Sequence, residues 1–465
     1  MDPVPDLAPA PATSATVTRR LARFIESVTA TELAPDVAEL ASLHLLDTIA
    51  SIVACRDLRA GEAARTYAAA GGHGDVPILG STDRASLLDA TFASAIVAHG
   101  AEINDFCPSA FVQPGPGVVS TALCVGLDRD RTGAEVLRAI AAGYEVACRT
   151  PKAIGIDTLR AHGIACHSVG ALFGVATTTG ALLGFDDRHA VDLIAYCAQQ
   201  ASGSWQWLLD IDHLEKSFVF GGMAVHNALH AALLVEAGFT GVPDALDVDG
   251  GWLAGGLLAR RDRTSMNSLV DGLGHDYQLD LVGYKRFPVG GPVQPIVQGM
   301  LELMDGETER DIKRIDVRMP GAAATFAGAL MPALNARYLV ALIVIDGALD
   351  FVAAQSHERF HHDEQVRALM DRIAIVHDPD QETTPRSESA TITIEFASGR
   401  TRSTHVDHVR GYPSHPMDRD QVIAKARDLI SRHFSATQTD EIVATVLAIA
   451  ELDSVRPIVD AIARP

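Results

Sequence analysis

Apolar residues recur at helical spacing through most of the first 265 residues. In 16–33 they fall at Leu21, Phe24, Ile25 and Val28, and in 35–56 they form a stripe wide enough for a buried helix. Pro35 stands where a first helical turn accepts proline. The same pattern predicts further helices over 85–100, 117–127, 132–149, 168–183, 187–202 and 217–237. Short links join them, so this part is predicted to be an all-α block.

The pattern changes near residue 266. Short alternating, β-branched segments predict strands over 312–320, 372–378, 390–399 and 401–411. Helices are expected over 293–305 and 338–349, and again over 418–434 and 438–451. We therefore predict a mainly α protein: a helical domain of 16–265 plus 416–465, and a smaller α+β domain of 266–415. Residues 1–15, rich in Pro and Ala, are predicted to be a disordered lead-in.

Composition narrows the function classes. A chain of 465 residues, 48% hydrophobic and 21% charged, is typical of a soluble globular protein. The net charge of −21 disfavours nucleic acid as a partner. No apolar run is expected to approach the roughly 18 residues of a membrane span. The six cysteines form no CxxC pair and are expected to be free thiols, and we expect a cytoplasmic protein.

Lysine is rare in this chain, and two of the five lysines stand in unusual surroundings. Lys216 follows two tryptophans and opens an apolar, small-residue segment, where partial desolvation lowers a lysine pKa and suits a base or an anion clamp. The alternative is a solvated lysine paired with Glu215 or Asp212. Lys285 and Arg286 lie in a Gly/Pro loop and could bind carboxylates, or could be a basic surface loop.

Several other side chains are candidates. His162 and His167 precede a helix start, where exposed N–H groups favour anions and a neutral imidazole can accept a proton. A structural role, as expected for His44 in a leucine-rich helix, is the alternative. Asp105 and Cys107 lie in a loop after a helix, where a loop or capping role is the alternative. Tyr144 lies within a helix and would by default be a core residue.

Metal and nucleotide motifs are not indicated. The histidine groups at 357–362 and 405–408 lack a familiar ligand spacing. The sequence has no GxxxxGK[ST] and no GxGxxG after a strand.

Several stretches together resemble one family. They are LLDTIAS (45–51), GYEVACR (143–149), HSVGALFGVATTTGALLGFD (167–186), QQASGSW (199–205), KSFVFGGMAVHN (216–227), AGFTGVPDAL (237–246), YKRFP (284–288), NARYLVALIVIDGAL (335–349) and GYPSHPM (411–417). In order and spacing they resemble the MmgE/PrpD family, which includes 2-methylcitrate dehydratase, cis-aconitate decarboxylase and iminodisuccinate epimerase. The resemblance implies an α+β lid inserted into the helical domain, a homodimer, and a metal-free, cofactor-free site between the domains.

The resemblance also implies site residues. The family's site lysines fall on Lys216 and Lys285, its site histidine on His167 or His162, and its first acidic loop residue on Asp105. The family's loop D-F-D-D-T-H…H-P is altered here: Asn104 and Cys107 stand within it, and Gln113 replaces the later histidine. Gln113 cannot take a proton, so any acid/base role of that histidine is lost or moved.

These observations predict a cofactor-free lyase, a dehydratase or decarboxylase, acting on a small di- or tricarboxylate. Lys216, Lys285 and Arg286 would bind carboxylates and stabilise an enolate. One of His167, His162 and Tyr144 would move the α-proton, and Asp105 would orient a cation or the substrate. Gln113 and Cys107 are further expected substrate contacts. The altered loop keeps two alternatives open: an isomerase or epimerase of a small dicarboxylate such as iminodisuccinate, and a non-catalytic carboxylate-binding relative.

Overall fold

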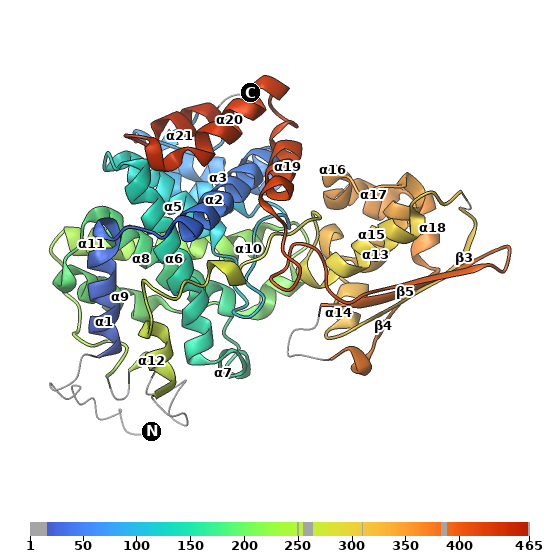
Figure 1. Ribbon diagram of the computed structural model, residues 1–465, viewed down its shortest axis with the longest axis horizontal. Coiled ribbons are helices and arrows are strands. Elements are labelled where there is room, and N and C mark those ends of the chain that lie inside the picture. The colour runs from blue at the N-terminus through green and yellow to red at the C-terminus, as the bar shows by residue number, and fades with distance from the viewer. Residues whose placement is uncertain (1–15, 249–250, 254–263, 309, 383–387, 464–465) are drawn as a thin grey trace.

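A large helical body and a smaller α+β lid lie side by side in the computed structural model (Figure 1). The structure describes residues 16–248, 251–253, 264–308, 310–382 and 388–463. The predicted disordered segment 1–15 lies outside the described residues. The predicted fold class, mainly α with a small α+β part, is confirmed.

The body begins with long helices that the apolar stripes predicted. α1 is capped by the Thr16 side chain, and α6 begins with a capping box between Thr132 and Glu135. The helices of this first part are α1 (Val17–Ser27), α2 (Pro35–Cys55), α3 (Arg59–Ala70), α4 (Leu87–Ala98), α5 (Gly115–Asp128), α6 (Gly133–Ile154), α7 (Ile156–Ala161), α8 (Cys166–Leu183), α9 (Asp187–Gln200), α10 (Leu214–Ser217), α11 (Met223–Glu236) and α12 (Thr264–Val270). A two-stranded ribbon, β1 (Val76–Pro77) and β2 (Arg84–Ala85), lies between α3 and α4.

Helix α8 is the centre of the body. Every residue from Cys166 to Leu182 is buried, which requires that its polar side chains find partners inside. Thr177 and Thr179 donate to backbone carbonyls one turn earlier in the helix, and Thr178 donates to the Ala139 carbonyl of α6. Small residues let α6 approach closely at this helix. A short α6–α8 separation therefore fixes the start of α8, where His167 lies.

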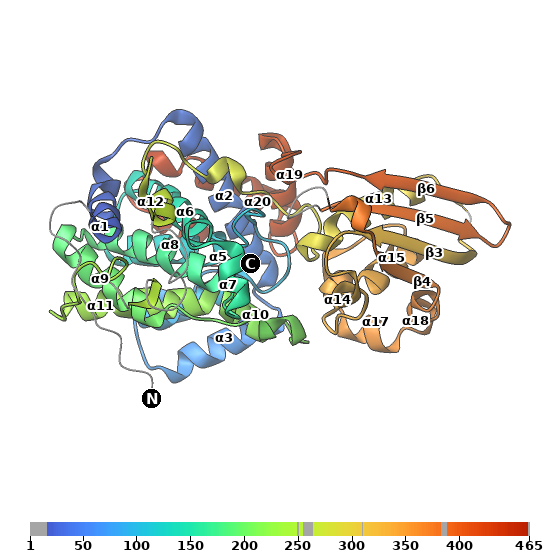
Figure 2. The same cartoon turned by 90° about the horizontal axis from the view of Figure 1, so that it is seen from below.

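The lid is built on a four-stranded sheet in the order β4-β3-β5-β6. β3 pairs in parallel with β4 and antiparallel with β5, with Ile315 opposite both Ile373 and Ile394. Buried and half-buried residues alternate along β5, so one face carries the apolar core, which α13 and α15 cover (Figure 2). The strands are β3 (Ile312–Met319), β4 (Ile373–His377), β5 (Ala390–Phe396) and β6 (Thr401–Val406), and the helices are α13 (Gln294–Met304), α14 (Ala323–Ala327), α15 (Ala336–Asp346), α16 (Phe351–Gln355), α17 (His357–His362) and α18 (Glu364–Met370).

The chain then returns to the body. α19 (Arg419–Ile430), α20 (Ala436–Leu447) and α21 (Arg456–Ile462) follow the last lid strand, and α19 packs on α2 (Figure 1). Lys425 of α19 donates to Asp47 of α2 and to the Ile103 carbonyl. The lid is thus inserted between two parts of one helical unit. The boundaries at 265 and 415 stay predictions, although the change from helices to strands lies between α12 and β3 and the return between β6 and α19.

Three helical stretches of the described chain, α2, α8 and Leu214–Glu236, are long and apolar enough to cross a membrane by length and composition. The prediction that no apolar run approaches the length of a membrane span is wrong for these three stretches, which reach that length and apolar composition. In this fold 94% of the α8 window is buried among other helices. The buried shares of the α2 and Leu214–Glu236 windows are 78% and 61%, so most of each window packs against the rest of the protein.

We expect Gly174→Ala to lower the free energy of unfolding by about 1–3 kcal/mol, because the site is already filled. A Cβ there would lie 2.6 Å from the Gly143 carbonyl oxygen and 2.7 Å from the Ala147 Cβ. Chemical denaturation measures the loss. The control is Gly328→Ala, where the nearest atom is 3.5 Å away and a change within about 0.5 kcal/mol is expected. Equal effects at the two glycines would contradict the close α6–α8 contact.

Candidate functional site

A cavity of about 270 Å³ lies between the helical body and the lid. The body contributes charged and aromatic side chains from the loop after α4, from α8 and from the segment around α10, and the lid contributes the turn after β3 together with α14. His167, Lys216, Lys285 and Gln113 all line it. The structure therefore brings four of the predicted site residues together, and the outermost two, Gln113 and Lys285, are 172 residues apart in sequence.

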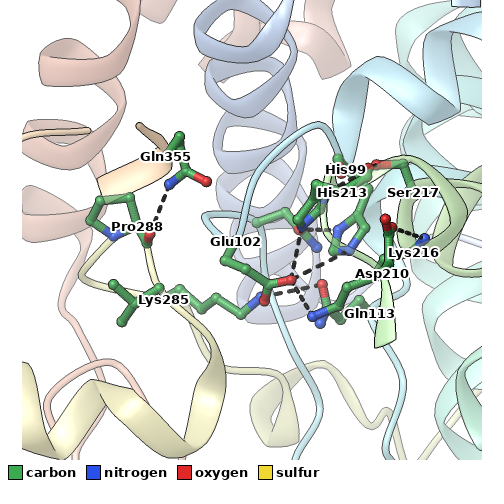
Figure 3. Close-up of polar contacts among 12 residues, drawn as sticks. His99, Glu102, Gln113, Asp210, His213, Lys216, Ser217, Lys285, Pro288 and Gln355 are labelled. Carbon is green, nitrogen blue, oxygen red and sulfur yellow. Dashed lines mark hydrogen bonds and ion pairs between the residues drawn. The ribbon is translucent and has the colours of Figure 1, made fainter. Parts of the chain in front are cut away.

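Glu102 lines this cavity, and its polar contacts are drawn in Figure 3. Its carboxylate pairs with the ammonium groups of Lys216 and Lys285, the latter at 2.9 Å from Oε2. His213 Nε2 lies 3.0 Å from Oε1. All four side chains are at most 7% exposed, so these charges are shielded from water. The cluster is one carboxylate shared by two cations.

Glu102 is placed by the end of α4. His99 caps this helix, and its Nδ1 lies 2.7 Å from Asn104 Oδ1, which closes the loop around Glu102. The Ser217 hydroxyl donates to the His99 carbonyl from the other side. Glu102 therefore points inward because both ends of its loop are tied down.

Lys216 is placed by an unusual turn. His213 adopts a left-handed conformation with φ +61°, and the Asp210 side chain accepts from the Lys216 N–H. A π-helical turn, η3 (Phe218–Gly222), follows at once, a feature often found at functional sites. Gly221 in this turn lets it approach α4, because a Cβ there would lie 2.5 Å from the Ala95 carbonyl oxygen.

Lys285 is placed by a short ladder at the domain junction. Phe106 and Gly283 exchange backbone hydrogen bonds of 2.9 and 2.8 Å. The Tyr284 N–H donates to the Gly411 carbonyl on the chain returning from the lid. With its backbone held on both sides, Lys285 reaches Glu102 and also Gln113 Oε1, at 3.3 Å.

The electrostatics of the cluster follow from burial and pairing. Burial by itself raises the pKa of Glu102, but Lys216, Lys285 and His213 outweigh it, and the pKa lies well below its usual range. Burial lowers the pKa of Lys216, and Glu102 opposes this effect. Burial and the neighbouring His213 hold the pKa of His99 well below its usual range, so His99 is neutral. Pairing within the cluster therefore favours the charged forms of Glu102 and the two lysines, although all three are shielded from water.

His167 lines the same cavity at the start of α8. It is 5% exposed, and its ring stacks on Phe220 with 4.1 Å between centroids. Trp205 and Trp207 meet it edge-on, each at 5.3 Å. A histidine held among rings in this way has a fixed orientation toward the cavity.

Of the described residues, His99, Glu102 and His213 could hold a metal ion, since their ligand atoms lie within 4.8 Å of one another. Two ammonium groups already pair with the same carboxylate. A divalent cation would be placed beside both, and like-charge repulsion makes this a poor fit. A hydrogen-bonded ionic cluster fits these residues better.

The structure does not bring Asp105 and Tyr144 to this cavity. They form a separate buried network, in which the Tyr144 hydroxyl donates to Asp105 Oδ2 and His44 Nδ1 lies 3.2 Å from the same oxygen. Asp105 also accepts from the Gly115 N–H at the start of α5. Burial and Asp105 raise the pKa of Tyr144 well above its usual range. Contacts of this kind support a positioning role for Asp105.

Cys107, His162 and Arg286 also lie away from the cavity. Cys107 is buried beside Cys148, whose hydrogen bond lowers its pKa to about 6. His162 is exposed on the last turn of α7, and its ring lies 2.8 Å from the Thr158 carbonyl oxygen. Arg286 lines a second cavity of about 370 Å³ together with Lys425. The catalytic or binding roles given to them from sequence have no support in this geometry.

Glu102 is the residue that sequence reasoning missed. A signal was present: Glu102 lies in the loop three residues after His99, where an apolar helix ends, and loops positioned by a rigid scaffold often carry functional side chains.

Comparison with models of known families shows to which family the chain belongs. The model of the MmgE/PrpD N-terminal domain matches residues 19–260, and the model of the MmgE/PrpD C-terminal domain matches residues 287–449. The chain belongs to the MmgE/PrpD family. No curated protein matched the chain significantly. Membership in the MmgE/PrpD family indicates an enzyme of the dehydratase or lyase type without naming its reaction.

We expect Glu102→Gln to lower the free energy of unfolding by about 3–5 kcal/mol at neutral pH, because it leaves two buried ammonium groups without an anion. The folded-state pKa of Glu102 is depressed, so its contribution is present above the unfolded pKa of about 4.3 and is lost as pH falls through the folded pKa. The gap between the two proteins should therefore narrow in acid. Chemical denaturation across pH measures it.

The matched control is Glu395→Gln. Glu395 of β5 pairs with Lys313 of β3, and the two side chains are 39% and 63% exposed, so a change within about 0.5 kcal/mol is expected. If Glu102→Gln lowered the free energy of unfolding as little as this control at neutral pH, Glu102 could not be the anion that stabilises the two buried ammonium groups.

Proposed function

We propose that this protein is a lyase that removes a proton next to a carboxylate of a small acid, using its own side chains and no cofactor. The observation that carries the proposal is the convergence of Lys216, Lys285 and His167 on one cavity whose floor is Glu102. Enolate chemistry needs a base for the α-proton and fixed positive charge near the carboxylate. These groups are of the types that supply both.

The two lysines would stabilise negative charge. Glu102 keeps them charged despite burial, and each ammonium has three N–H donors, so donors remain for a substrate. When the α-proton leaves, charge moves onto the substrate carboxylate. Preformed cations in a cavity of low polarity stabilise this charge more than water does.

His167 would accept the α-proton. Its imidazole faces the cavity and is the side chain whose ordinary pKa lies nearest neutrality. In a dehydration the departing hydroxyl must also receive a proton, which Lys216 or Lys285 could donate. Proton removal by His167 and proton donation by a lysine together release one water and leave a carbon–carbon double bond.

The family resemblance makes a di- or tricarboxylate the first candidate substrate. Decarboxylation would use the same cations, with loss of CO₂ in place of the α-proton.

The alternative is an isomerase. It is supported by the presence of two proton-transfer groups, His167 and Lys216, in one cavity, since one could remove a proton and the other return it. A homodimer and a cytoplasmic location stay predictions.

We expect Lys216→Met to lower kcat by about 10²–10³-fold and His167→Asn by about 10²–10⁴-fold. The assay follows absorbance, CO₂ release and exchange of the α-proton in D₂O. The panel includes 2-methylcitrate, cis-aconitate, iminodisuccinate and 3-hydroxy acids with one carboxylate.

Lys313→Met, at a side chain of β3 that is 63% exposed, is the control and should retain full activity. Absence of turnover and of exchange on the whole panel by the unmodified protein would favour the non-catalytic relative. Full activity of both cavity variants would show that the chemistry lies elsewhere.

A further inference from the structure

A second cavity, of about 370 Å³, lies at the junction of the lid and the C-terminal helices. The chain entering the lid, the start of α16, the chain leaving the lid and α19 all contribute to its walls. Four of its described lining side chains are cationic: Arg286, Arg410, Lys425 and Arg432. In a chain with a net charge of −21, this cavity is a local region of positive charge.

Two of these cations have carboxylate partners. Lys425 is nearly buried and pairs with Asp47 of α2. Arg432 pairs at 3.0 Å with Asp350, which caps α16, and so joins the body to the lid. Asp428 is the carboxylate among the described lining residues, and it lies 3.8 Å from Arg432. These contacts neutralise Lys425 and Arg432 and leave the other two cations to be explained.

Within the part of the chain that the structure describes, neither Arg286 nor Arg410 pairs with a carboxylate. Arg286 is exposed, and its Cζ lies 5.1 Å from the centroid of the Phe287 ring. Arg410 Nη1 makes two long contacts, at 3.5 Å to the Pro416 carbonyl and at 3.4 Å to Gln421 Oε1. A guanidinium has five N–H donors, so both arginines keep donors for a ligand.

Arginine side chains select the chemistry of that ligand. The planar guanidinium fork matches the oxygen pairs of carboxylates and phosphates and binds them through two parallel hydrogen bonds. Two such groups together attract an anion with two or more negative charges more strongly than a singly charged one. Small-molecule sites are often found between domains, and about 370 Å³ is enough for a small molecule.

The second cavity lies next to the segments that carry the Glu102 cluster. Glu102 and Lys285 line the first cavity, and their chain neighbours Ile103 and Arg286 line the second. Lys425 Nζ donates to the Ile103 carbonyl at 2.7 Å. Burial lowers the pKa of Lys425, and repulsion by Lys285 lowers it further, so the two cations affect each other across this boundary. A negative charge in the second cavity would offset that repulsion.

We propose that the second cavity is a binding site for a small anion with two or more negative charges, a phosphate or a polycarboxylate, held by Arg286 and Arg410. The anion bridges the chain that enters the lid and the chain that leaves it, beside the Arg432–Asp350 ion pair between body and lid. Its binding therefore stabilises the position of the lid. This site is separate from the reaction proposed for the first cavity and does not depend on it.

Three probe anions test the charge requirement. Calorimetric titration of the full chain compares inorganic pyrophosphate, propane-1,2,3-tricarboxylate and acetate. We expect at least one of the first two to bind about tenfold tighter than acetate, and added salt to weaken it by screening. Tighter binding of pyrophosphate assigns the site to phosphates, and tighter binding of the tricarboxylate assigns it to polycarboxylates. If neither binds tighter than acetate, the proposal is overturned.

Variants locate the bound anion. Arg286→Gln and Arg410→Gln should each weaken the tighter anion at least about tenfold, and Arg286→Lys, which keeps the charge, should recover part of the affinity. Both arginines are exposed or half-buried, so the variants are expected to fold, and thermal unfolding without anion checks this. Arg188→Gln, at an exposed residue of α9 outside both cavities, is the control. Weakening by Lys216→Met, in the first cavity, with no effect of the arginine variants overturns the proposal.

Hydrogen exchange tests the effect on the lid. The Tyr284 N–H, which donates to the Gly411 carbonyl at the junction, should exchange several-fold more slowly with saturating anion, and Arg410→Gln should remove this slowing. The Gly399 N–H, at the far turn between β5 and β6, is the control and should not change. Binding without slower exchange of Tyr284 contradicts the stabilised lid. Neither measurement uses turnover, so failure of this site and failure of the lyase function are distinguishable.

Discussion

The pairing of Glu102 with Lys216 and Lys285 is the constraint on which the site depends. Taking each ammonium out of water costs several kcal/mol, and only a close carboxylate offsets this. Because both lysines are at most 4% exposed, three chain segments must meet accurately before any of the three charges is tolerated. The packing that brings these segments together therefore also sets the charge of the site, because Glu102 is the carboxylate that stabilises both buried lysines.

Backbone hydrogen bonds at the junction of the body and the lid hold the segments that meet at the site. Phe106 pairs with Gly283, and Tyr284 donates to the Gly411 carbonyl, so the loop after α4, the segment carrying Lys285 and the chain leaving the lid are joined by backbone hydrogen bonds. Insertion of the lid is what makes this possible, since the chain must pass the site once on entering the lid and once on leaving. A lid added at a chain end would supply one pass only.

The sequence predicted most of the helices and the lid strands. It did not predict the members of the site that are set by contacts between segments far apart in the chain. Apolar periodicity predicted α2, α6 and α8 closely, and alternation predicted the lid strands. The resemblance pointed to Lys216 and Lys285 as site residues, which the structure brings to one cavity. Glu102 was missed because an acid in a polar loop looks solvated until its partners are known. Asp105 and Tyr144 were assigned to the site for the converse reason, since sequence does not show which buried network a side chain joins.

Aromatic rings surround the cations of the cavity. Lysines surrounded by rings are desolvated, which strengthens their attraction for a carboxylate. Arg160 Cζ lies 5.5 Å from the Phe111 centroid and 5.7 Å from the Trp205 centroid, so this side chain contributes to the aromatic wall as well as to the charge. The same residues that prepare proton transfer therefore also restrict what can be brought to it.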